Sequence, residues 1–232
     1  MGYVRAMRAG ARILPGEAMS AGELTVRRWA ADDAAALVAA VAASREHLRP
    51  WMPWASGVQD TAEQRRGRIE RWNHAWRAGG DAVYGIFVAG RVAGGCGLHR
   101  RLGPDGLEMG YWLHVDFTGR GVMTVAATLL TEAAFTVPEV ELVEIHHDAA
   151  NEPSGGVPRR LGYTLVEQVV REPQTPAELG VELRWRITRT QWAQRPAGCS
   201  TSSNVARWAA EGVAICSTPP PPPQLSCSPP DS

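Results

Sequence analysis

The stretch Gly110–Met123, GYWLHVDFTGRGVM, decides the fold class because it reads as a strand that passes through a glycine-rich turn directly into a helix. The first four N–H groups of a helix have no partner inside the helix and lie at the positive end of its dipole. Gly119 and Gly121 let an anion approach the main chain of the turn, and Arg120 adds positive charge. The stretch therefore predicts a site for a diphosphate, although glycine pairs before helices also serve only to turn the chain.

The flanking sequence supplies further strands and helices. Period-two or glycine-bounded segments predict strands at 24–29, 82–88, 91–101, 107–115, 142–148, 163–171 and 181–188. Capping residues and the period of 3.6 predict helices at 32–44, 61–77, 122–135 and 151–161. This order predicts an α/β fold with helices on the faces of a sheet.

Composition excludes several classes of function. The chain has 232 residues, 44% hydrophobic and 21% charged, which is normal for a soluble globular protein. Its formal net charge of zero gives no field that would attract nucleic acid or an anionic membrane. All 24 basic residues are arginine, which excludes a Schiff-base lysine and a P-loop. The absence of lysine, together with the abundant Ala and Gly, indicates a GC-rich bacterial genome.

Cysteine spacing and hydropathy set the expected location. The four cysteines match no zinc or CxxC pattern, so we expect reduced thiols, no metal and a cytoplasmic protein. No apolar run reaches the roughly 18 residues of a membrane span. Patterning begins after Met19, so residues 1–22 are expected to be a mobile N-terminal extension and 23–192 the folded domain. Residues 193–232, with five prolines from Pro219, are expected to be a disordered Pro/Ser-rich tail.

Four segments together resemble the GNAT acetyltransferase superfamily and, within it, the ribosomal-protein N-acetyltransferase (RimJ/RimL-like) branch. They are LRPWMPWA at 48–55, GYWLHVDFTGRGVMT at 110–124, EIHHDAANEPS at 144–154 and VPRRLGY at 157–163. The resemblance covers about residues 24–189. It implies a mixed, mostly antiparallel central sheet with helices on both faces and a splayed pair of central strands. It also implies transfer of an acetyl group from acetyl-CoA to a primary amine.

The resemblance implies a CoA site on the turn. In the family this turn reads Q/R-x-x-G-x-G/A, and Thr118, Gly121 and Met123 stand at those positions, so the central Gly alone is kept. The main chain of the turn is expected to bind the CoA diphosphate through Gly119, Arg120, Gly121, Val122 and Met123. The pantetheine arm is expected along the backbone of the preceding strand, at Leu113, His114 and Val115. Asn151, in the last motif, is expected to make a further contact with CoA.

The catalytic groups implied by the resemblance depart from the usual set. Many family members protonate the leaving thiolate with a Tyr, but Pro158 takes its place here. In the ribosomal-protein branch a Ser has this role, and Ser154 stands at that position. Because Pro153, Gly155, Gly156 and Pro158 are poor helix formers, we expect the last helix to begin late, at about Val157, and to misplace Ser154. Glu108 is the expected base for the amine proton; the alternative is a solvated Glu at a strand edge.

The acceptor cleft is expected beside a proline-rigid loop. Trp51 and Trp54 lie in that loop, which caps the acceptor cleft in this branch, although they could also be core aromatics. His99 could line the acceptor pocket. His146 and His147 face opposite sides of one strand, so at most one reaches the slot between the splayed strands.

Two questions stay open at this level. The acceptor is either a protein N-terminal α-amine or the amine of a small molecule. The alternative to an enzyme is a catalytically impaired CoA-binding sensor or interaction module, which the departures at Met123 and Pro158 and the disrupted last helix would favour. Exposed sheet edges leave a homodimer open.

Overall fold

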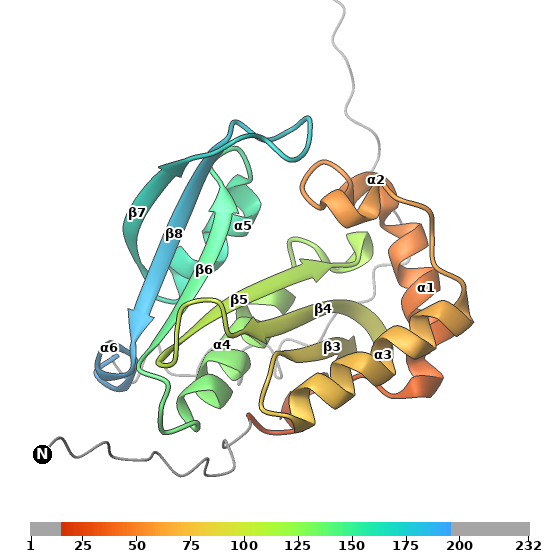
Figure 1. The fold of residues 1–232 in the computed structure, drawn as a ribbon, viewed down its shortest axis with the longest axis horizontal. Coiled ribbons are helices and arrows are strands. Elements are labelled where there is room, and N and C mark those ends of the chain that lie inside the picture. Colours follow the sequence, from red (N-terminus) through yellow and green to blue (C-terminus); the bar gives the residue numbers. More distant parts are fainter. Residues whose placement is uncertain (1–14, 196–232) are drawn as a thin grey trace, which may run out of the picture.

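The computed structural model describes residues 15–195 (Figure 1). The expected tail from residue 196 and the extension up to residue 14 lie outside the described residues. Part of the expected extension is folded, because Ala18–Ala21 form strand β1 and pair with the next strand. This corrects the domain boundary at residue 23, which the weak alternation of the short segment AMSA does not reveal.

The remaining elements follow the predicted order closely. The strands are β2 (Leu24–Arg28), β3 (Ala82–Val88), β4 (Arg91–His99), β5 (Gly106–Leu113), β6 (Leu142–Asp148), β7 (Thr164–Val170) and β8 (Val181–Thr188). The α-helices are α1 (Ala34–Ala43), α2 (Arg45–Leu48), α3 (Ala62–Arg77), α4 (Val122–Phe135), α5 (Glu152–Arg160) and α6 (Arg189–Ala193). Three short 3₁₀ turns are η1 (Ala31–Asp33), η2 (Pro53–Ala55) and η3 (Val115–Phe117).

The eight strands form one sheet in the order β1-β2-β3-β4-β5-β6-β8-β7. Each neighbouring pair is antiparallel except β5 and β6, which are parallel. The parallel pair is joined by the crossover helix α4, as a parallel connection requires. This confirms the expected mixed, mostly antiparallel sheet.

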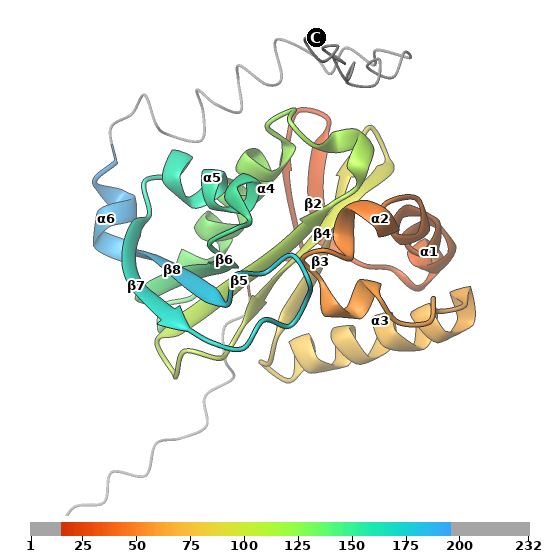
Figure 2. The ribbon, with the colours of Figure 1, turned by 90° about the horizontal axis from the view of Figure 1, so that it is seen from above.

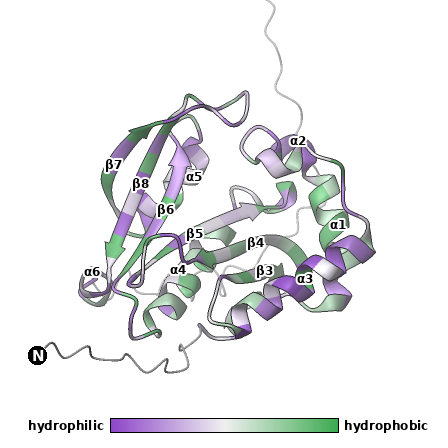
Figure 3. Cartoon of the chain, in the orientation of Figure 1, coloured by the Kyte–Doolittle hydropathy of each residue, from purple (hydrophilic) through white to green (hydrophobic). Residues whose placement is uncertain are grey.

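Helices cover both faces of the sheet (Figure 2). On one face α4 buries Val122, Ala126 and Leu130 in the larger core, and Figure 3 shows it as largely hydrophobic. On the other face α1 and α3 bury Leu37 and Ile69 in a smaller core. The mainly hydrophilic colouring of α3 in Figure 3 agrees with its exposed outer side. The helices on this second face contact β3 and β4, so the half of the sheet beyond β5 forms a wall of the cleft described below.

Candidate active site

The two parallel strands separate part-way along their length. Their ladder runs from Gly106 opposite Leu142 to Met109 opposite Ile145 and ends there. Beyond that point β5 continues as far as Leu113 against β4, while β6 continues to Asp148 against β8. The expected splay of central strands is therefore confirmed, and it opens a slot with main-chain groups along one side.

Strand alternation shows which main-chain groups face the slot. His114 donates its amide to the carbonyl of Ala93 on the β4 side, 2.8 Å away. Because successive residues of a strand direct their N–H and C=O groups to opposite edges, Tyr111 and Leu113 direct theirs into the slot. The Val115 amide instead donates to the hydroxyl of Ser44 at 3.1 Å. Of the three backbone positions expected to bind pantetheine, Leu113 alone presents its amide to the slot.

The turn before α4 presents free helix-start amides. Gly119 and Gly121 have φ angles of 72° and 75°, in the left-handed region that favours glycine. Gly121 is the N-cap of α4 and no side chain caps it. A Cβ at either glycine would meet no heavy atom within 4 Å, so the space in front of the turn is open. The two glycines are therefore explained by backbone conformation, and the geometry fits an anion on the amides of Val122 and Met123.

Two arginines flank this turn. Arg120 lies within it and is exposed. Arg160, at the end of α5, donates to the Thr124 hydroxyl in the first turn of α4 at 3.1 Å. Sequence reasoning missed Arg160, because only the fold brings the end of α5 beside the start of α4.

The helix α5 begins at Glu152, so the expected late start at Val157 is wrong. The Asn151 side chain caps the helix by accepting the Ser154 amide at 3.3 Å. Pro153 lies in the first turn, where a missing N–H costs nothing. Gly155 is required by packing, because a Cβ there would lie 2.6 Å from the His147 ring. Ser154 therefore occupies a defined helical position next to the slot.

An acid–base cluster lines the second face of the sheet beside the slot. Glu108 forms an ion pair with Arg101 at 2.9 Å, and its other oxygen lies 3.9 Å from His146 Nδ1. The other ring nitrogen, Nε2, lies 2.6 Å from Glu144. Burial opposes ionisation of Glu144, but hydrogen bonds from His146 and Arg186 outweigh it and lower the pKa of Glu144. An ionised Glu144 accepts the Nε2 proton and leaves Nδ1 of His146 directed toward Glu108.

His147 lies on the opposite face and is held neutral. Its Nε2 accepts the indole N–H of Trp185 at 3.0 Å, and its Nδ1 donates to the carbonyl of Asp148 at 2.8 Å. Burial is the main cause that lowers the pKa of His147. Both histidines line the cleft, from opposite faces of β6, so the expectation that at most one reaches it is corrected. The splay makes this possible because the cleft passes between the strands.

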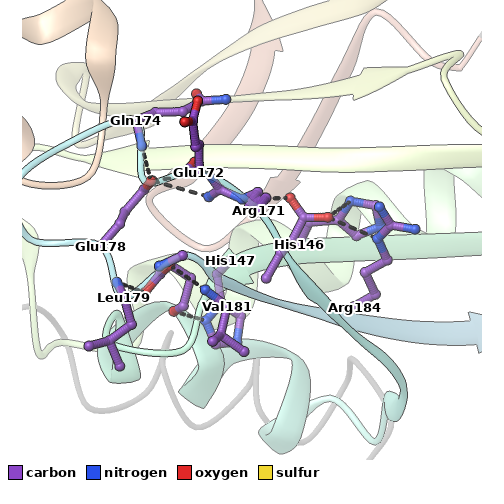
Figure 4. Close-up of polar contacts among 12 residues, drawn as sticks. His146, His147, Arg171, Glu172, Gln174, Glu178, Leu179, Val181 and Arg184 are labelled. Atoms are coloured by element: carbon purple, nitrogen blue, oxygen red, sulfur yellow. Dashed lines mark hydrogen bonds and ion pairs between the residues drawn. The ribbon is translucent and has the colours of Figure 1, made fainter.

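Polar contacts hold the loop between β7 and β8, residues 171–180, against the end of β6 (Figure 4), and Arg171, Gln174 and Glu178 of this loop line the cleft. The buried Asp148 carboxylate accepts four main-chain amides, from Ala150, Leu179, Gly180 and Val181. These bonds outweigh the cost of burial and lower the pKa of Asp148. Glu178 pairs with Arg171 at 3.0 Å within the loop, and the Thr175 hydroxyl donates to the Pro50 carbonyl in the loop after α2.

Aromatic side chains form the opposite wall. Trp54 packs edge-on against Trp112 of β5, with ring centroids 6.1 Å apart, and Trp51 also lines the cleft. The indole of Trp112 lies over Gly95, where a Cβ would be 2.6 Å from its Nε1. Gly95 therefore makes room for the tryptophan.

One cleft of about 1020 Å³ brings together six of the fourteen predicted site residues. It is lined by Trp51, Trp54, His99, Glu108, Asn151 and Ser154 of the predicted set, and by Tyr111, Trp112, His146 and Glu182. His99 lies over Gly97 and pairs with Asp81 at 2.8 Å. The turn 119–123 and residues 113–115 do not line this cleft.

Residues 23–164 match the family described as "Acetyltransferase (GNAT) domain". The chain belongs to the GNAT acetyltransferase family. The match takes in the splayed strands, α4 and α5, so the geometry above belongs to a GNAT domain. It confirms the resemblance on the four quoted segments, and with it the assignment as an N-acetyltransferase that uses acetyl-CoA.

Known GNAT proteins support this placement. The chain is 27% identical over 141 residues to "Putative ribosomal N-acetyltransferase YdaF" of Bacillus subtilis (strain 168), covering 60% of this chain and 77% of that protein. Its fold is similar to Mycobacterium smegmatis RimJ in complex with CoA-disulfide, with a TM-score of 0.70, 20% identity and coverage of 80% and 90% of the two chains. It is also similar to RimL, a ribosomal L7/L12 acetyltransferase in complex with coenzyme A, with a TM-score of 0.69, 19% identity and coverage of 75% and 99%.

Residues 15–195 were also considered for a metal site and for a membrane-spanning helix. No group of three or more His, Cys, Asp or Glu side chains is arranged to hold a metal ion in that part of the chain. None of its helices is both long and apolar enough to cross a membrane.

Proposed function

We propose that this protein acetylates the N-terminal α-amine of a peptide or protein, with acetyl-CoA as the donor and direct attack of the amine on the thioester. The observation that carries the proposal is the ladder that ends at Met109 and Ile145. Beyond Met109 the main chain of β5 is no longer paired with β6, and we place the pantetheine arm there, beside the cleft that Glu108 lines.

For the donor, we assign the diphosphate to the turn before α4. The amides of Val122 and Met123, the positive end of the helix dipole and the guanidinium of Arg120 provide binding for negative charge. Arg160 is a second cation within reach of this turn, and Gly119 gives the turn its shape. The pantetheine arm then runs along the Leu113 backbone with Asn151 at the far side of the slot.

The reaction needs a neutral amine and a carbonyl held close to it. The amine nitrogen attacks the thioester carbon, a C–N bond forms, and the C–S bond breaks with its electron pair on sulfur. The nitrogen releases one proton and the thiolate later gains one, so the products are an amide and CoA thiol. Proximity alone can supply about 7–11 kcal/mol of the barrier, so modest acid–base assistance is sufficient.

We assign proton removal to Glu108 and His146. The Nδ1 atom of His146 lies between Glu108 and Glu182, 3.9 and 3.7 Å from their oxygens, while Nε2 lies 2.6 Å from Glu144. A proton leaving the amine can therefore pass to Glu108 directly or through a water, with His146 beside it. Ser154 is proposed to assist the thiolate from the other side of the slot.

A peptide acceptor is favoured over a small molecule by the size and walls of the cleft. Its volume of about 1020 Å³ lies at the upper end of the range for small-molecule pockets. Trp51 and Trp54 are offered as its aromatic wall and His99 as part of its floor. A free α-amine has a pKa near 8 and loses its proton more readily than a lysine side chain, which suits a site without a strong base.

The test has two steps. Calorimetry with CoA and acetyl-CoA measures donor binding, and a thiol-release assay with a panel of peptides of different N-terminal residues measures transfer. We expect saturable binding and turnover with at least one free N-terminus, abolished when that N-terminus is already acetylated. Absence of CoA binding at 1 mM (about the weakest affinity of a useful site) would refute the proposal.

The alternative of a CoA-binding module without catalysis loses part of its basis. It depended on a disrupted last helix, and α5 begins at Glu152 with its cap in place. The departures at Met123 and Pro158 remain. Binding without turnover across the peptide panel would be the result that favours the module.

We further propose a cytoplasmic protein of a bacterium, with residues 15–195 as the catalytic domain and a homodimer that pairs through β7. The argument for the dimer is that β7 is the last strand of the sheet and exposes Leu165, Val166 and Val170. Light scattering of the wild type and of Val166→Lys tests it; a monomeric wild type at micromolar concentration contradicts it.

A further inference from the structure

The hydrogen-bond ladder of α5 has a gap that a side chain from the sheet fills. Pro158 has no N–H, so the Ser154 carbonyl four residues earlier lacks its helical donor. The hydroxyl of Tyr111, on β5, donates to this carbonyl with an O···O distance of 2.9 Å. A residue of the slot wall therefore completes the helix.

The same phenol also binds the Ser154 side chain. The Ser154 hydroxyl donates to Tyr111 Oη at 3.3 Å. A phenol has one proton, and here it is committed to the carbonyl, so its oxygen is free to accept the serine proton. Burial is the main cause that raises the pKa of Tyr111 to about 12, against the effects of Ser154 and Arg160. The phenol therefore keeps its proton and the pair of bonds keeps one arrangement.

Both groups lie where the slot meets the cleft. Tyr111 comes two residues after Met109, at which the parallel ladder ends, and both Tyr111 and Ser154 line the cleft. The titratable neighbours are His147 from β6, whose two ring nitrogens are occupied, and the buried Tyr163, which interacts electrostatically with Tyr111. The nearby cation from α5 is Arg160.

We propose that Tyr111 is a positioning residue. Its bond to the Ser154 carbonyl fixes this turn of α5 at the mouth of the slot, so that the Ser154 hydroxyl can leave the phenol oxygen and donate a hydrogen bond to the departing CoA thiolate. The inference rests on the proposed function and adds to it the residue that makes Ser154 effective. The electron pair of the broken C–S bond stays on sulfur, and Ser154 stabilises it by a hydrogen bond. The proton that converts thiolate to thiol comes from water, and Tyr111 releases none.

Pro158 explains why Tyr111 bonds the Ser154 carbonyl. In the family pattern described above, a Tyr at this helix position is the acid, and here a proline replaces it. The proline removes a backbone donor, and the vacant carbonyl orients a phenol that arrives from β5. The two departures, a missing Tyr and an extra Pro, are thus parts of one arrangement.

The experiment uses CoA itself and needs no acceptor. The ultraviolet absorbance of the thiolate is followed against pH for CoA saturated with protein, minus protein alone, which gives the thiol pKa of bound CoA. The variants are Ser154→Ala, Tyr111→Phe and the double variant. The matched control is Tyr163→Phe, because the buried Tyr163 hydroxyl bonds Thr131 on α4 at 2.8 Å and does not line the cleft.

We expect the wild type to lower the CoA thiol pKa by about one unit relative to free CoA, as one or two hydrogen bonds to an anion do. Ser154→Ala and Tyr111→Phe should each remove at least half of this shift, and the double variant should match Ser154→Ala because Tyr111 acts through Ser154. Tyr163→Phe should behave as the wild type. The affinity for CoA should stay within about threefold in all four variants.

Three results would overturn the inference. They are a wild-type pKa in Tyr111→Phe, a double variant whose effect is the sum of the single effects, and a wild type that leaves the CoA thiol pKa unchanged. Failure of the wild type to bind CoA would remove the proposed function instead. Should Tyr111→Phe unfold, the comparison is made in a Pro158→Ala background, where residue 158 regains an N–H for the Ser154 carbonyl.

Discussion

Replacing Asp148 by Asn should loosen the loop 171–180 without disturbing the donor site. The Asp148 carboxylate accepts four main-chain amides, two of them from the end of this loop and one from Val181, the first residue of β8. An asparagine side chain offers one oxygen, which accepts two N–H groups, and an NH₂ group that faces the other two donors. Two of the four amides therefore lose their acceptor; the bond from Gly180 is buried and the other three are part-buried.

The magnitude follows from these two amides. A buried donor without an acceptor costs about 1–3 kcal/mol, so the loss of unfolding free energy is about 2–6 kcal/mol. For a domain of this size each kcal/mol lowers Tm by about 2–4 °C, and a fall of at least about 4 °C is expected. Asp33→Asn is the control, because the Asp33 carboxylate accepts from Arg27 and from one amide, that of Ala30, at the far side of the sheet.

The assay is hydrogen exchange with calorimetry. In Asp148→Asn, the amides of Leu179, Gly180 and Val181 should exchange faster, and the acceptor KM should rise because the loop forms one wall of the cleft. The Kd for CoA should stay within twofold. Unchanged exchange in this loop, with Tm within 1 °C of the wild type, would refute the account of how the loop is held.

Three further predictions concern the turn, the base and acid stability. Gly121→Ala and the control Gly90→Ala both place a side chain at positive φ, 75° and 76°, with no heavy atom within 4 Å. Each variant should lose about 1–2 kcal/mol of stability. Only Gly121→Ala should also weaken CoA binding, by about tenfold or more, as the loss of one charge-assisted hydrogen bond would. Equal CoA affinities of the two variants in calorimetry would contradict the proposed diphosphate site. Glu108→Gln should lower kcat/KM for a peptide by about 10²–10⁴ with CoA affinity unchanged, and full activity in steady-state kinetics would exclude Glu108 as the base. The pKa values of Asp148 and Glu144 are lowered from 3.8 and 4.5. The stability that these carboxylates contribute is therefore complete above pH 3.8 and 4.5 and is lost as pH falls through their lowered pKa values. Tm should fall steeply below about pH 4, less so in Asp148→Asn, and a Tm that stays constant down to about pH 3 would contradict this.

The strands and helices were predictable because their patterns are local. The bounds of β3, β6, β8 and α4 match the predicted ranges, and the capping box of Thr61 and Gln64 forms at the start of α3 as expected. The predicted start of α5 was wrong because it was based on helix propensity alone. The Asn151 cap, the harmless position of Pro153 and the contact of Gly155 with His147 outweigh it.

The candidate site was only partly predictable, because its chemistry depends on contacts between distant segments. Ser154 could be named from the motif in which it stands, and Glu108 from its place at the start of the strand before the glycine-rich turn. Tyr111 could not be assigned a role, because its value depends on the Ser154 carbonyl, 43 residues away. The pairing of His146 with Glu144 and its approach to Glu108 likewise require the register of β5 against β6.

The contact between Thr175 and Pro50 joins two connections that are 125 residues apart in the chain. Both are surface loops, and such segments accept insertions and substitutions more readily than strands do. The proposed donor site is instead embedded in β5 and α4. Selection could therefore exchange one acceptor for another by remodelling these loops, while the thioester-handling machinery is inherited intact.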